Sequence, residues 1–175
     1  MTKVNIKIKL NIKFIAILLI LVLVGLGITF YILHVSSLMK EKKQILSDLE
    51  YTYYYLKNEP TNLRLFGAVG KEDGVARSAW ENYLSNSDSE IKKLSGLLAK
   101  NKEKIEKFKE LKKTKLFDKL QASLDKFKKI RDESEKRIWG NSSFSEEKLK
   151  NLERELQDIL KEAKEEAKSL GLNLR

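Results

Sequence analysis

The chain has 175 residues, no cysteine, one histidine and a formal net charge of +10. The lack of cysteine excludes disulfide bonds and thiolate chemistry. Charged residues make up 34% of the sequence, but the hydrophobic share of 42% is too high for a disordered tail. Basic residues alternate with Glu and Asp and form no recognised nucleic-acid motif, so we expect no nucleic-acid partner.

The first feature along the chain is an uncharged stretch over residues 14–33, which reads FIAILLILVLVGLGITFYIL. An α-helix rises about 1.5 Å per residue, so these residues cover roughly the 30 Å hydrocarbon thickness of a bilayer. The stretch is longer than the apolar core of a secretory signal peptide, which has roughly 7–15 residues. We therefore predict an uncleaved transmembrane helix over 14–33, with the lipid bilayer as its partner.

The residues that flank this stretch bear on its orientation. Residues 1–13 form a basic leader that contains four lysines and no acid, but Lys40, Lys42 and Lys43 follow closely behind the apolar stretch. The positive-inside bias is therefore slight. We predict a single-pass protein of the cell (inner) membrane with a cytoplasmic leader and an extracytoplasmic C-terminal domain. An intracellular domain held at the inner leaflet by its lysines is the alternative.

Residues 38–175 have the length of one ordinary domain and carry apolar residues at helical spacing. The first helix is expected to continue out of the membrane and to end at Pro60. Its apolar face comprises Leu38, Ile45, Leu49, Tyr53 and Leu56. The segment Asn58–Gly74 contains one proline and three glycines, so we interpret it as a connector.

A second helical stretch is expected from Val75 onwards. Ser87 and Glu90 match a capping box, which predicts a break and a restart there. Two apolar stripes follow: Ile91, Leu94, Leu98, Ile105, Phe108 and Leu111, then Leu116 or Phe117, Leu120, Leu124, Phe127, Ile130 and Ile138. Asn101 takes an expected apolar slot of the first stripe. Residues 88–139 are either one helix about 78 Å long or two helices with a break where Thr114 caps the second.

Gly140–Ser143 is a stop signal, and Ser143 with Glu146 predicts the start of a last helix that ends at Leu170–Gly171. The apolar stripe of this helix comprises Leu149, Leu152, Leu156, Ile159, Leu160, Ala163 and Ala167. Helices with one apolar stripe each are unstable alone, and short connectors make successive helices antiparallel neighbours. The predicted fold is all-α: an N-terminal transmembrane helix continuing into an antiparallel up-down-up-down four-helix bundle over residues 38–175.

No catalytic set is present in the sequence. It contains no GxSxG motif, no phosphate-binding loop and no dinucleotide fingerprint, and its single histidine, His34, follows the apolar stretch directly. We expect no metal, no cofactor and no enzymatic activity.

Aromatic and arginine residues provide the candidate ligand site. Tyr51 and Tyr55 lie four residues apart, and Arg64, Arg77 and Trp80 follow them in the sequence. An arginine beside aromatic faces can hold a carboxylate while the rings cover the apolar part of a ligand. The alternative is that the tyrosine rings pack against the stripe while their hydroxyls stay hydrated.

Three segments resemble the N-terminal sensory region of methyl-accepting chemotaxis proteins and membrane histidine kinases. They are the leader and membrane stretch Ile6–Ile28, the segment Leu63–Leu84 (LRLFGAVGKEDGVARSAWENYL) and the turn Ile138–Leu149 (IWGNSSFSEEKL). The resemblance implies a membrane helix that continues into a periplasmic four-helix bundle. Those receptors also have a second span and a cytoplasmic output region, which this sequence lacks, so we expect it to act through a partner.

Two functions follow from these features. The first is a membrane-anchored, non-enzymatic, sensor-like bundle that binds a small ligand or a protein partner, including a second copy in a homodimer. The alternative is an elongated coiled-coil tether or scaffold of the cell envelope.

Overall fold

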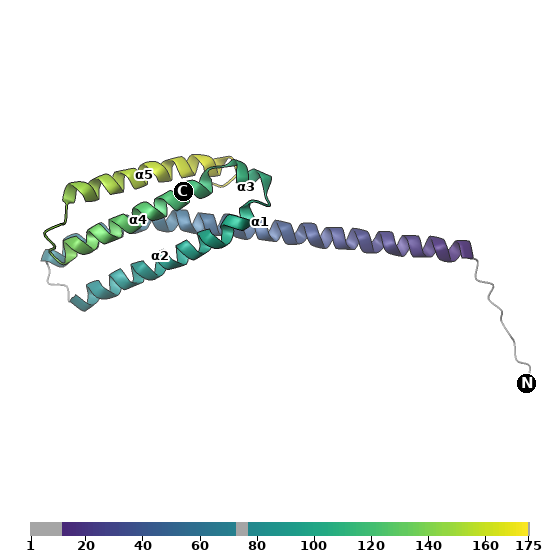
Figure 1. The fold of residues 1–175 in the computed structure, drawn as a ribbon, viewed down its shortest axis with the longest axis horizontal. Helices are drawn as coiled ribbons and strands as arrows, with labels where there is room; N and C mark the ends of the chain where they lie inside the picture. Colours follow the sequence, from purple (N-terminus) through teal and green to yellow (C-terminus); the bar gives the residue numbers. More distant parts are fainter. Residues whose placement is uncertain (1–11, 73–76, 175) are drawn as a thin grey trace, which may run out of the picture. The chain divides into compact units, whose positions relative to one another are not determined.

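The computed structural model describes the backbone of residues 12–72 and 77–174 and the side chains of residues 15–64 and 78–174. All regular secondary structure in these ranges is helical (Figure 1). The helices are α1 (Ile12–Glu72), α2 (Arg77–Ile105), α3 (Lys109–Lys113), α4 (Leu116–Ile138) and α5 (Glu146–Lys168). The all-α prediction is confirmed.

The chain divides into two units, Met1–Lys43 and Gln44–Arg175. In the first unit the apolar side chains of α1 face outward: Leu23 is 65% exposed and Phe30 is 75% exposed. The apolar part of α1 has a mean hydropathy of 2.9, and none of it is buried. Among the described residues, α1 is the one helix that is long and apolar enough to cross a membrane.

The second unit has one hydrophobic core to which all five helices contribute. Leu56 of α1, Leu94 of α2, Leu111 of α3, Leu124 of α4 and Leu156 of α5 are each no more than 2% exposed. Fully burying a leucine side chain contributes roughly 1.5–3 kcal/mol. Most of the core residues fall on the apolar stripes that the sequence predicts, so those stripes hold the helices of this unit together, with Leu63, Leu84 and Leu174 as additions.

Among helices α2 to α5, the pair α4 and α5 shares the most extensive contact. Among the ion pairs that join them, three are spaced by seven residues: Lys119–Glu162, Lys126–Glu155 and Glu133–Lys148. Residue numbers rise by seven from pair to pair along α4 and fall by seven along α5, so the two helices are antiparallel. We call these three pairs the α4–α5 ladder.

Hydrogen bonds join α1 and α2 in the same antiparallel sense. They pair Asp48 with Asn101, Tyr51 with Glu90, and Glu59 with Tyr83. Later residues of α1 thus meet earlier residues of α2, as expected for two helices with a short connection.

Pro60 does not end the first helix, contrary to the sequence prediction, because α1 continues to Glu72. A proline inside a helix removes the backbone bond to the carbonyl four residues earlier and usually kinks or breaks the helix. Here Pro60 is buried, and Leu63, one turn later, is fully buried in the core. Core packing on both sides of Pro60 offsets the lost bond. Most of the predicted connector Asn58–Gly74 is therefore helical, and residues 73–76 lie outside the described part.

The predicted break at Ser87 is also wrong, because α2 runs through it without interruption. Ser87 is 1% exposed. It continues the alternating three- and four-residue spacing of Leu84, Ile91 and Leu94, so it takes a core position of the helix. The apolar stripe on both sides outweighs the local capping signal.

Residues 88–139 are not one helix. Helix α2 ends at Ile105 and α4 begins at Leu116, with the short helix α3 between them. The predicted break near Thr114 is confirmed, but Thr114 ends α3, and its hydroxyl donates to the Leu111 carbonyl at 3.0 Å. The N-cap of α4 is Lys115, which makes no side-chain capping bond.

The turn after α4 is a glycine stop, as predicted. Gly140 has φ +63°, and the amide of Asn141 donates to the Lys136 carbonyl at 2.9 Å. This geometry is that of a Schellman motif, which satisfies the last carbonyls of the helix. The start of α5 differs from the prediction. Ser145, not Ser143, is the N-cap, and its hydroxyl accepts from the backbone N–H of Lys148 at 3.2 Å.

The end of the last helix agrees with the prediction. Helix α5 ends at Lys168, and Gly171 follows three residues later with φ +74°. The amide of Leu172 donates to the Ala167 carbonyl at 3.1 Å, which repeats the Schellman pattern.

Candidate functional site

Tyr51, the first predicted site residue, is on the α1–α2 side of the second unit. Its hydroxyl donates to the Glu90 carboxylate at 2.9 Å and accepts from the Lys93 ammonium at 2.7 Å. The same ammonium lies 4.5 Å from the centroid of the Tyr51 ring. Tyr51 as a whole is 39% exposed. Tyr51 is therefore held by residues of the protein itself, although part of its ring faces solvent.

Tyr55 lies one turn further along α1 and points towards α4. Its ring packs edge-on against Phe127, with the centroids 5.8 Å apart. Burial raises the pKa of Tyr55, and the carboxylates of Glu59 and Glu90 raise it further. The hydroxyl therefore stays protonated and can serve as a hydrogen-bond donor.

Trp80 is 5% exposed and packs edge-on against Tyr83, with the ring centroids 6.4 Å apart. The Tyr83 hydroxyl donates to the Glu59 carboxylate at 2.8 Å. Burial, together with this acceptor, raises the pKa of Tyr83. Trp80 thus belongs to the packed side of α2 and offers little surface to a ligand.

Arg64 is not brought together with Tyr51. It follows Tyr51 by 13 residues on α1, which places it about 20 Å along the axis and about 220° around it. Its guanidinium faces α5 and lies 3.8 Å from the Glu153 carboxylate. The side chain of Arg77, the remaining predicted residue, lies outside the described residues. The structure thus places Arg64 on a different face of α1 from Tyr51 and Tyr55, and it places Trp80 on α2.

A groove lies between α1 and α5, on the face that carries Arg64. It has a volume of about 330 Å³. Its lining residues are polar or charged apart from one proline: Pro60, Thr61, Arg64, Lys150, Glu153, Arg154 and Gln157. We call this the α1–α5 groove. It combines three cations with one carboxylate.

Glu153 sits on the inner side of this groove, and its side chain is 18% exposed. Burial raises the pKa of Glu153, while the nearby Arg64 guanidinium acts in the opposite direction. The carboxylate is therefore poorly solvated despite three neighbouring cations.

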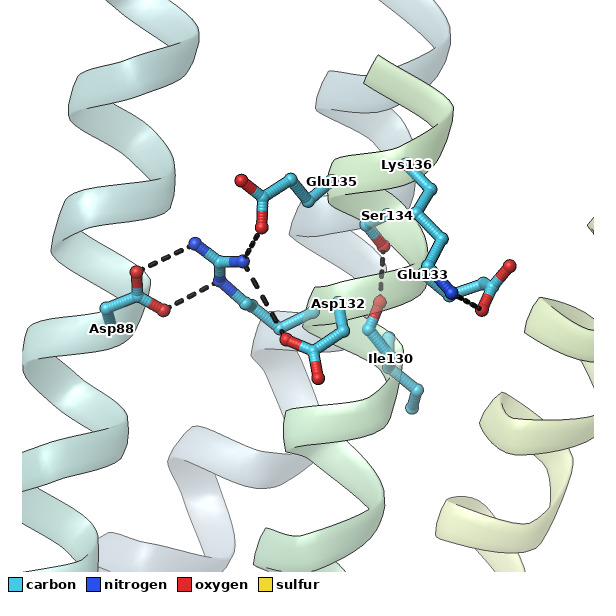
Figure 2. Close-up of polar contacts among 8 residues, drawn as sticks. Asp88, Ile130, Asp132, Glu133, Ser134, Glu135 and Lys136 are labelled. Carbon is cyan, nitrogen blue, oxygen red and sulfur yellow. Dashed lines mark hydrogen bonds and ion pairs between the residues drawn. The ribbon is translucent and has the colours of Figure 1, made fainter. Parts of the chain in front are cut away.

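Two other charged clusters have a structural role. Arg131 of α4 donates a hydrogen bond at 2.7 Å from a terminal guanidinium nitrogen to Asp88 of α2, and its Nε lies 2.7 Å from the other carboxylate oxygen as an ion pair without hydrogen-bond geometry. We call this the two-pronged contact. Arg131 also pairs with Glu135 (Figure 2). This pairing joins α2 to α4. A planar guanidinium can face both oxygens of a carboxylate at once.

The second cluster surrounds Glu133, which is 1% exposed. Its carboxylate accepts from the Lys148 ammonium at 2.9 Å and from the Ser145 backbone N–H at 3.1 Å. These bonds, with a further one from Lys136, lower the pKa of Glu133 against the effect of burial. Glu133 thus ties the end of α4 to the start of α5.

Among the residues with described side chains, 15–64 and 78–174, no group of three or more His, Cys, Asp or Glu residues is placed to hold a metal ion. The hydroxyl and carboxylate groups of the α1–α2 face bond to each other. The cations of the α1–α5 groove make longer or fewer contacts: Arg64 lies 3.8 Å and Lys150 4.0 Å from the nearest carboxylate, and Arg154 donates one hydrogen bond to Asn151.

Sequence reasoning identified Arg64 but missed the α5 side of the groove. A signal was present. Lys150, Glu153, Arg154 and Gln157 are spaced by three, one and three residues, so they share one polar face of α5. Nothing in this spacing indicates that α1 lies opposite that face.

The chain matches no protein-family model, no curated protein and no solved structure.

Proposed function

We propose that the chain is a membrane-anchored, non-enzymatic helical bundle that binds a small ligand or a protein partner outside the cytoplasm. The observation that carries this proposal is the contrast between the two units. One exposes an unbroken apolar helical surface, and the other buries its apolar residues in a core of its own. Apolar surface of the first kind is stable in lipid, whereas the second unit suits water.

We further propose that the second unit is an up-down-up-down four-helix bundle, with α3 as part of one connection. The antiparallel contacts of α1 with α2 and of α4 with α5 support this arrangement. The pairing of Asp88 with Arg131 joins the two hairpins.

The rival tether requires one long helix over residues 88–139. Because α2 ends at Ile105 and α4 begins at Leu116, the bundle is favoured. The resemblance to chemoreceptor and histidine-kinase sensory regions motivates the sensor-like role. In this proposal the domain acts through a partner protein or a second copy of the chain.

The absence of cysteine makes the proposed topology directly testable. Single cysteines are introduced by Thr2→Cys in the leader and Ser89→Cys on the exposed side of α2, and intact cells are treated with a membrane-impermeant maleimide. We expect Ser89→Cys to be labelled in intact cells and Thr2→Cys only after lysis. The reverse pattern would overturn the orientation.

Extraction tests the anchor separately. Membranes are washed with alkaline carbonate, and the intact full-length chain is expected to stay in the pellet. Recovery of the unprocessed chain in the wash would remove the transmembrane helix from the proposal.

A further inference from the structure

The α1–α5 groove has an excess of positive charge. Arg64, Lys150 and Arg154 surround a single carboxylate, that of Glu153. The groove volume of about 330 Å³ falls at the lower end of the range for small-molecule sites, roughly 300–1,000 Å³. The groove is therefore sized for a small ligand and has the charge to hold an anion.

The cations of this groove are only weakly engaged by the protein. Arg64 lies 3.8 Å from the Glu153 carboxylate, well beyond the roughly 2.7–2.9 Å of a charge-assisted hydrogen bond. Lys150 reaches a carboxylate only at 4.0 Å. Arg154 donates one bond, at 3.0 Å, to the neutral amide oxygen of Asn151. Most of their N–H groups thus remain available to a ligand.

The two arginines come from different helices, Arg64 from α1 and Arg154 from α5. A planar guanidinium presents paired donors that match the two oxygens of a carboxylate or phosphate. Thr61 and Gln157 add a hydroxyl and an amide at the same groove. An oxyanion placed there would join α1 to α5 through charge-assisted hydrogen bonds.

We propose that the α1–α5 groove binds a small oxyanion, a phosphate or a carboxylate, through Arg64, Lys150 and Arg154. This inference rests on the proposed binding function and names its ligand class. Glu153, whose carboxylate lies 3.8 Å from the Arg64 guanidinium, competes with the ligand for this arginine.

The test uses the full-length chain in nanodiscs of zwitterionic phosphatidylcholine, which removes anionic lipid as a competitor. Inorganic phosphate and succinate are titrated separately by calorimetry at physiological ionic strength, where non-specific surface attraction is screened. Wild type is expected to bind at least one of the two saturably. Tighter binding of phosphate or of succinate shows whether the groove prefers a phosphate or a carboxylate group.

Variants then locate the site. Arg64→Gln combined with Arg154→Gln is expected to weaken binding by about tenfold or more, because two charge-assisted contacts are lost. Glu153→Gln is expected to tighten binding, because it removes the competing carboxylate. Lys100→Gln, which removes one charge from an exposed position of α2, is the control and is expected to leave the affinity within about twofold.

Melting temperatures of the ligand-free variants are measured alongside, and Arg154→Gln alone replaces the double variant if that one fails to fold. Failure of wild type to bind either anion saturably, or equal affinity in wild type and the arginine variant, would overturn the proposal. Such a result leaves the membrane topology untouched, because cysteine labelling and carbonate extraction test that independently.

Discussion

The side-chain amide of Asn101 donates a 2.9 Å hydrogen bond to the carboxylate of Asp48 across the α1–α2 contact, and both side chains are buried. Asp48 also accepts from the Gln44 amide at 2.7 Å. A polar residue in an apolar slot is costly unless it finds a partner of this kind. The pair therefore fixes which residues of α1 and α2 face each other.

Replacing Asn101 by Leu is expected to destabilise the protein by about 1–3 kcal/mol, because one buried carboxylate oxygen of Asp48 loses its donor while the other keeps Gln44. The double variant Asp48→Leu/Asn101→Leu is expected to recover most of this loss, since both polar groups are then gone. Denaturant unfolding of both variants provides the measurement. Equal losses in the free energy of unfolding for the single and the double variant would contradict this account.

Glu133 is expected to stabilise the native state at neutral pH and to lose this effect in acid. Its folded-state pKa is lowered, first by Lys148 and then by the Ser145 backbone N–H. The native state therefore favours the ionised form of Glu133. The resulting stabilisation is fully present above the pKa of a glutamate in the unfolded chain, about 4.3. It is lost as pH falls through the lowered pKa of the folded state.

Glu133→Gln is accordingly expected to cost about 1–2 kcal/mol at pH 7, with the difference from wild type shrinking below about pH 4. Thermal melts from pH 3 to pH 8 measure this. Glu147→Gln, at an exposed position next to the start of α5, serves as the control and should show no such trend.

Glu153 is expected to show the opposite dependence on pH. Burial raises its pKa, although Arg64 from α1 and Arg137 and Lys150 nearby lower it, and Glu146 adds to the rise. The native state then prefers the protonated carboxyl. The protonated carboxyl of Glu153 therefore stabilises the folded state. This stabilisation is fully present below the pKa of Glu153 in the unfolded chain, and it is lost as pH rises through the raised pKa of the folded state.

Glu153→Gln should therefore melt at a higher temperature than wild type at pH 7.5, and the two melting temperatures should converge towards pH 4. A variant that is less stable than wild type at pH 7.5 would show that the pairing with Arg64 outweighs the burial of the carboxylate.

Arg131 should not tolerate lysine, because an ammonium cannot span both oxygens of Asp88. The Arg131 side chain is 11% exposed. Arg131→Lys is expected to destabilise the fold by about 1 kcal/mol. Arg137→Lys, the same change on the same helix, is expected to cost less than about 0.5 kcal/mol, because Arg137 meets Glu146 only at 3.7 Å. Both variants are measured by chemical denaturation. Similar losses in the free energy of unfolding for Arg131→Lys and Arg137→Lys would contradict the role given to the two-pronged contact.

The sequence was sufficient to predict the helices and their buried faces wherever apolar spacing was regular. Leu98, Leu124 and Leu156 lie on predicted stripes and are no more than 1% exposed. Gly140 and Gly171 marked helix ends correctly because each takes a positive φ that favours glycine.

The sequence prediction failed where packing overrides a local signal. Pro60 and Ser87 resemble a stop and a start, yet both are buried inside continuous helices. The break after Ile105 was missed because Phe108 and Leu111 maintain the helical spacing across it. The α1–α5 groove could not be predicted from the sequence, because the groove depends on which helices become neighbours in the fold.

The α4–α5 ladder also determines how the last two helices can slide against each other. Along α4 the charges run Lys119, Lys126, Glu133, and the partners on α5 carry the opposite signs. A slip by one heptad in one direction would set Glu133 against Glu155, and a slip in the other would set Lys126 against Lys148. Because each misaligned register brings like charges together, the order of signs selects one alignment from several that the leucine spacing alone would allow.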